Sequence, residues 1–109
     1  MSLNLEQLAA AMVNAAKGQI TDNWPQIKDY AEQEAKKLAE NFVLIEKQKL
    51  TNQLSDEQAE LMHQMQKNAS KAVLLSVQGM TTLMAEQALN AALDAVKTTV
   101  NTALNFTLL

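Results

Sequence analysis

The charge-poor end of the chain, residues 72–109, reads AVLLSVQGMTTLMAEQALNAALDAVKTTVNTALNFTLL. It carries three charged side chains, Glu86, Asp94 and Lys97, whereas residues 22–67 carry fifteen. A helix with so few charges cannot leave a broad face in water, so other helices or a second chain must cover it. The pattern therefore indicates packing and assembly, and it supplies no catalytic group.

The composition favours helix along almost the whole chain. The protein has 109 residues, is 48% hydrophobic, and contains two glycines and one proline. Alanine, leucine, methionine, glutamine, glutamate and lysine, the common residues here, are good helix formers. The length fits one domain, residues 1–109. We therefore predict an all-α fold, either a long helical hairpin or a three- or four-helix bundle, antiparallel and oligomeric.

Two helices are predicted in the first half of the chain from the spacing of apolar residues. The first spans residues 3–17, and Gly18 ends it because glycine accepts the left-handed conformation that follows many helices. The second spans residues 22–52, with Asp22 as the cap that accepts from the free amides of the first turn.

A third helix is predicted over residues 55–104. Ser55 and Gln58 have the spacing of a capping box, in which each side chain bonds to the other residue's backbone amide. From there Gly79 is the one position that would break the helix and fold it back, giving four helices. A single internal glycine costs only about 1 kcal/mol relative to alanine, so the sequence leaves both arrangements open.

Beyond residue 85 this helix is apolar on two opposite sides. One side consists of alanines, and the other carries larger side chains. A helix that is apolar nearly all round must be buried, and a second copy of the chain would explain the extra face. We therefore predict a self-association interface formed by Leu89, Leu93, Val96, Val100 and Leu104.

One short motif has the spacing of a metal site. Glu60 and His63 form a Glu-x-x-His pair, which carboxylate di-iron bundles use twice together with two further glutamates. One chain supplies one such motif, so a dimer would be required. A helical wheel places Glu60 to the side of the apolar stripe, which favours a solvated surface pair. We predict no metal site and keep Glu60 and His63 as weak candidates.

Several function classes lack the residues that they need. The chain has no cysteine, and its glycines are isolated, so thiolate chemistry and a phosphate-binding loop are absent. All nine basic residues are lysines and the net charge is −3, which disfavours nucleic acid as a partner. No run of about 20 apolar residues predicts a membrane span, and the start lacks a secretory signal. We predict a cytoplasmic protein that is not an enzyme and binds no cofactor.

Three hypotheses on function remain. The first is a non-enzymatic helical assembly or protein-interaction module that self-associates through its charge-poor C-terminal helix. Its partner would be a second copy, as a homodimer or higher oligomer, or another helical protein. The alternative is a binder of apolar surfaces or lipid-like ligands, such as a membrane or granule surface. The third is a dimeric metal-binding helical bundle.

Overall fold

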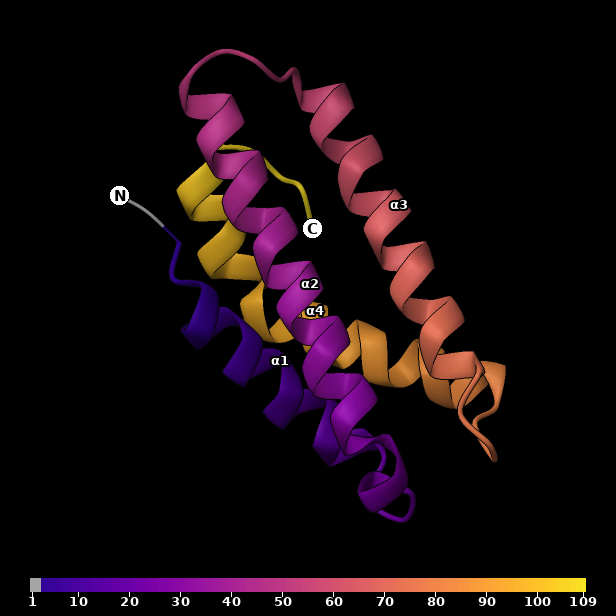
Figure 1. The fold of residues 1–109 in the computed structure, drawn as a ribbon. Helices are drawn as coiled ribbons and strands as arrows, with labels where there is room; N and C mark the ends of the chain where they lie inside the picture. The colour runs from indigo at the N-terminus through magenta and orange to yellow at the C-terminus, as the bar shows by residue number, and fades with distance from the viewer. Residues whose placement is uncertain (1–2) are drawn as a thin grey trace.

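In the computed structural model, which describes residues 3–109, the chain forms four α-helices packed antiparallel in a compact bundle (Figure 1). Their bounds are α1 Leu5–Gln19, α2 Trp24–Leu50, α3 Asp56–Leu75 and α4 Thr82–Leu104. The predicted all-α antiparallel fold is confirmed, and the four-helix arrangement is the one that the chain adopts.

The first two helices differ from their predicted bounds at their ends. Gly18 lies inside α1, and the backbone of Ile20 closes the helix by donating to the carbonyls of Ala16 and Lys17. The second helix begins at Trp24, and the residue before it makes no side-chain cap bond. The predicted roles of Gly18 as a helix stop and of Asp22 as the cap are therefore wrong.

The long third helix breaks after Leu75. Ser76 Oγ donates to the carbonyl of Val73 at 2.6 Å, and Gly79 follows in the left-handed region with a φ of 88°. The side chain of Thr81 then accepts from the amide of Met84 at 3.1 Å and caps α4. Side-chain hydroxyls therefore bond to the backbone on both sides of Gly79, from Ser76 before it and from Thr81 after it. At the start of α3 the predicted capping box of Ser55 and Gln58 is confirmed.

We expect alanine to destabilise the protein at one of the two glycines and to stabilise it at the other. At both positions the added methyl group meets nothing within 4 Å, so the backbone conformation alone decides the effect. Gly79→Ala should lower the free energy of unfolding by about 1 kcal/mol because of the positive φ. Gly18→Ala should raise it by about 0.5 kcal/mol because Gly18 is helical. Urea unfolding of both variants measures the difference, and equal effects would contradict this assignment of the turn.

The core lies between α1, α2 and α4. α1 packs extensively against both α2 and α4, whereas α3 packs mainly against α2 and has the fewest contacts with the rest of the bundle. Figure 1 shows α3 at the side of the molecule, away from α1. The largest fully buried side chains include Phe42, Met12, Ile27, Leu38 and Ile45. None of these five comes from α3.

The last residues fold back on the bundle. The amides of Leu108 and Leu109 donate to Asn101 Oδ1 at 2.9 and 3.0 Å. Phe106 lies under the ammonium group of Lys49, which is 4.4 Å from the ring centroid. One α4 amide side chain thus holds residues 108 and 109 against the body of the chain.

Candidate functional site

The stripe predicted as an oligomer interface lies in the core of the single chain. All five residues are at most 7% exposed, and they join one apolar cluster with Leu8 and Met12 of α1 and Phe42 of α2. The turn at Gly79 folds α4 back, and α1 then packs along it. The chain therefore covers this stripe itself, and the physical reason for expecting a second copy there no longer applies. The stripe is Leu89, Leu93, Val96, Val100 and Leu104.

The two residues of the metal motif lie in different surroundings. Glu60 is exposed, whereas His63 is 7% exposed and its ring packs on Phe42 with the centroids 5.3 Å apart. Burial, and then the nearby charge of Lys67, lowers the pKa of His63 to about 4. Its Nδ1 is buried without a hydrogen-bond partner. Within residues 3–109 no group of three histidine, aspartate or glutamate side chains is placed to hold a metal ion.

The inward face of α3 is unusually small and polar for a buried face. It presents Ala59, His63, Ser70 and Leu74 to the rest of the bundle. Ser70 is fully buried and accepts from Gln66 Nε2 at 3.2 Å. An amphipathic helix ordinarily turns its larger apolar residues inward, and α3 does so fully only with Leu74 and in part with Met62, which is half-buried against the core.

Three of the larger apolar residues of α3 instead face outward. Leu61 is 61% exposed and Met65 is 64% exposed, and Leu75 near the end of the helix is also exposed. Three further exposed and uncharged residues fall in line with these apolar residues. We define the α3 seam as the six exposed, uncharged residues Gln58, Leu61, Met65, Asn68, Ala72 and Leu75.

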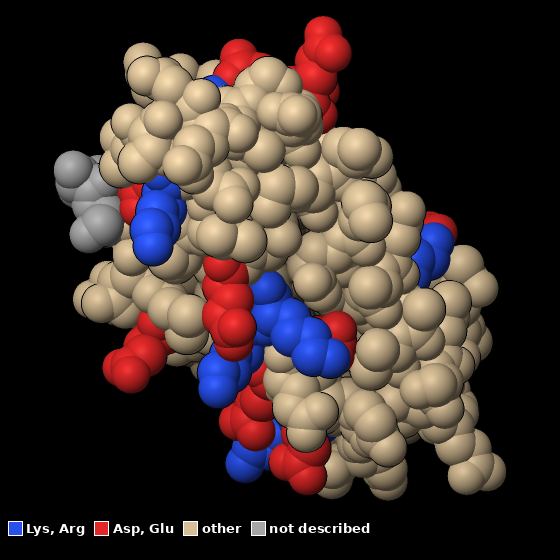
Figure 2. Space-filling model, turned by 45° about the horizontal axis from the view of Figure 1, so that its top comes forward, with Lys and Arg blue, Asp and Glu red and all other residues tan. Residues whose placement is uncertain are grey.

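The α3 seam has the spacing of a coiled-coil contact line. Its six positions alternate by three and four residues, which is the a and d pattern of a heptad repeat. Such a line keeps one direction along a helix that winds around a partner. In Figure 2 the side of the molecule on which α3 lies is mostly uncharged, whereas acidic and basic side chains gather nearer the middle of the view. The α3 seam is therefore the candidate interaction surface.

Sequence reasoning missed this surface although its signal is present. An eleven-residue spacing also joins Met62 to Val73 on a different side of α3, and both of those residues are half-buried. The heptad spacing of Leu61, Met65 and Ala72 is as regular. The spacing alone does not show that α3 lies at the edge of the bundle, and it is this position that leaves the line exposed.

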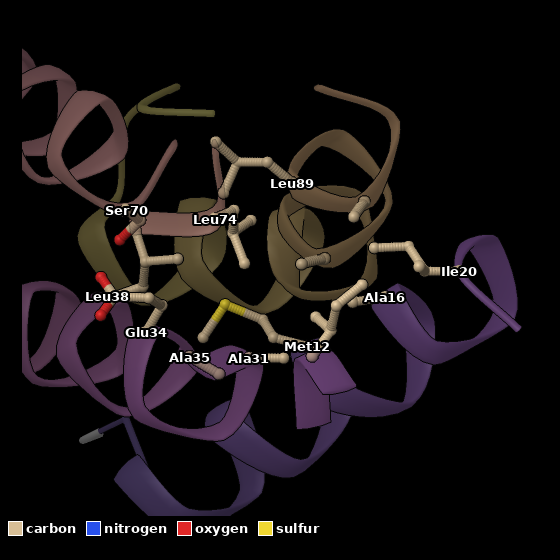
Figure 3. Close-up of a pocket in the computed structure, with 13 residues that line it drawn as sticks. Met12, Ala16, Ile20, Ala31, Glu34, Ala35, Leu38, Ser70, Leu74 and Leu89 are labelled. Atoms are coloured by element: carbon tan, nitrogen blue, oxygen red, sulfur yellow. The ribbon is translucent and has the colours of Figure 1, made fainter. Parts of the chain in front are cut away.

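A small internal cavity lies between the inward faces of the helices (Figure 3). Its volume is about 30 Å³, and its lining is apolar apart from Glu34 and Ser70 at one side. Glu34 pairs with Lys37 at 3.1 Å, and its second oxygen is buried without a partner. Such a space holds about one water molecule. It has no room for an acyl chain.

No α-helix between residues 3 and 109 is long and apolar enough to cross a membrane. Comparisons with protein-family models, with curated proteins and with solved structures find no match to this chain.

Proposed function

We propose that this protein is a non-enzymatic helical assembly module that self-associates through the α3 seam. The observation that carries the proposal is the reversed arrangement of α3, whose Leu61 and Met65 face outward while alanine, histidine and serine share the inward face with Leu74. Exposed apolar residues that recur along one side of a helix are typical of protein–protein contact sites. This surface replaces the α4 stripe, because α1 and α2 already cover that stripe.

The geometry supports the other hypotheses less well. The cavity of about 30 Å³ does not fit a lipid-like ligand, and the larger groove between α1 and α2, about 570 Å³, is lined in part by Glu6, Glu32 and Lys36. The metal hypothesis needs Glu60 and His63 to face one site, yet one side chain is exposed and the other is buried against Phe42. The buried carboxylates Glu34 and Glu46 bond to Lys37 and to the amide of Leu3. Assembly needs none of these groups.

We expect Leu61→Glu to abolish self-association. A carboxylate buried between two helices would lose its hydration without gaining a partner. Sedimentation velocity from 1 to several hundred micromolar should show the wild-type chain moving from monomer to dimer, and the variant remaining monomeric. One helix face buries less than the roughly 800 Å² per partner of a standard interface, so we expect a micromolar dissociation constant.

The matched control is Leu83→Glu on the first turn of α4. Leu83 is 62% exposed, nearly the same fraction as Leu61, and the substitution adds the same charge. This variant should dimerise like the wild-type chain. A wild-type chain that stays monomeric over the whole range would refute the proposal, and so would equal weakening by the two substitutions.

A further inference from the structure

The charged residues beside the α3 seam indicate how two copies would meet. Glu57, Gln64 and Lys71 are spaced by seven residues, so they lie in one line along the same flank of the seam, at heptad position g. The line runs from acidic through neutral to basic. Lys71 Nζ also pairs with Glu86 of α4 at 2.7 Å, and both side chains remain partly exposed. The opposite flank, position e, carries the uncharged Met62, Ala69 and Ser76.

The two possible orientations use these flanks differently. In a parallel helix pair, position g of one copy faces position e of the other, so the charges of Glu57 and Lys71 would meet Met62 and Ser76 of the partner subunit. In an antiparallel pair the g flanks face each other. Glu57 then lies opposite Lys71 of the partner subunit, twice by symmetry, and Gln64 lies opposite Gln64 of the partner subunit. Only the antiparallel orientation brings opposite charges together.

The same register also matches the α3 seam itself. Placing Leu61 opposite Met65 of the partner subunit leaves Glu57 and Lys71 of the partner subunit two residues, about 3 Å along the axis, from exact alignment, within the reach of these long side chains. Gln58 then lies opposite Asn68 of the partner subunit. Between positions 57 and 71, apolar residues thus face apolar residues, amides face amides, and acids face bases, while Ala72 and Leu75 extend beyond the start of the partner subunit's α3. A twofold axis between the helices generates every pair twice, as a closed dimer requires.

Resting on the proposed self-association, we infer that two copies dimerise by antiparallel packing of their α3 helices about an axis near His63 and Gln64. The flank charges select the orientation, and the α3 seam supplies the buried area. The inference names both the partner, a second copy of this chain, and the register in which it binds.

Disulfide trapping tests the register, and the cysteine-free chain gives no background. Single variants Gln58→Cys and Asn68→Cys keep every charge. They are mixed in equal amounts at the concentration at which the wild-type chain dimerises, and the mixture is then oxidised mildly. The antiparallel register brings position 58 of one copy beside position 68 of the other. Equivalent positions of two copies then lie about 15 Å apart along the axis, beyond the reach of a disulfide.

We expect the mixed 58–68 disulfide to be the main product, identified by intact mass against the two homodimers. Lys28→Cys, at an exposed position of α2, should give no cross-link above the level of random collision. A main product joining 68 to 68, or a statistical mixture of all three species, would overturn the antiparallel register. If sedimentation still showed a wild-type dimer, the proposed self-association would stand. A chain that remains monomeric and forms no cross-link would refute both.

Discussion

Phe42→Ala is expected to lower the free energy of unfolding by about 3–5 kcal/mol, the largest effect of any single substitution discussed for this chain. Phe42 is 0% exposed and belongs to the apolar cluster that joins α1, α2 and α4. It also supports α3, because its ring packs on His63. Removing the ring therefore leaves a cavity where all four helices meet. Domains of this size have about 5–15 kcal/mol of stability in total.

Thermal and urea unfolding measure the loss, and Phe106→Ala is the matched control. Phe106 is the other phenylalanine of the chain, is half-buried, and lies beneath the ammonium group of Lys49. The same deletion there should cost about 1 kcal/mol, since water already reaches the site. Phe42→Leu should cost less than the alanine variant because it fills most of the volume. Equal losses at positions 42 and 106 would contradict the placement of Phe42 at the centre of the core.

The helical fold could be predicted from the sequence because its signals are local. Apolar spacing indicated helices in all four regions, and the capping box of Ser55 and Gln58 is formed as predicted. The sequence does not decide whether the chain turns at Gly79, because a single glycine destabilises a continuous helix only slightly. The turn also depends on the hydroxyls of Ser76 and Thr81, which bond to the backbone only once the turn exists.

The exposed α3 seam, our proposed interaction surface, could not be predicted for a different reason. Whether an apolar stripe is exposed depends on which helix lies at the edge of the bundle, and that is a property of the packing. The larger stripe on α4, which includes Val96 and Val100, is the more apolar in sequence and is covered by α1. The weaker line through Leu61 and Met65 remains exposed because α3 packs mainly on α2. Hydrophobicity alone would therefore select the α4 stripe, which is covered, over the α3 line, which is exposed.

Acidification from pH 6.5 to about 4 is expected to destabilise the protein through His63. Burial, followed by the charge of Lys67, lowers the pKa of His63 in the folded chain to about 4, whereas an unfolded histidine titrates near 6.5. Between these values the unfolded chain binds a proton that the folded chain does not, so stability falls as the pH falls. A tenfold difference in acidity corresponds to about 1.4 kcal/mol, which gives a loss of about 3 kcal/mol by pH 4.

The surroundings of His63 account for its lowered pKa. Lys67 lies one turn further along α3, and a groove between α3 and α4 joins His63 to Lys67, Asp94 and Lys97. Lys67 opposes a positive imidazole, and burial of the ring against Phe42 removes its hydration. Nδ1 has no hydrogen-bond partner that would stabilise a second ring proton.

His63→Gln isolates the contribution of this one group. The chain has a single histidine, so its imidazole proton resonances can be followed by NMR without ambiguity. We expect the folded resonances to stay unchanged down to about pH 5 and the unfolding free energy of the wild-type chain to fall between pH 6.5 and 5. The variant should show a much flatter dependence over that range, where few carboxylates titrate. A titration midpoint near 6.5 in the folded chain, or an unchanged slope in the variant, would mean that His63 is hydrated and that α3 does not pack against Phe42 as described.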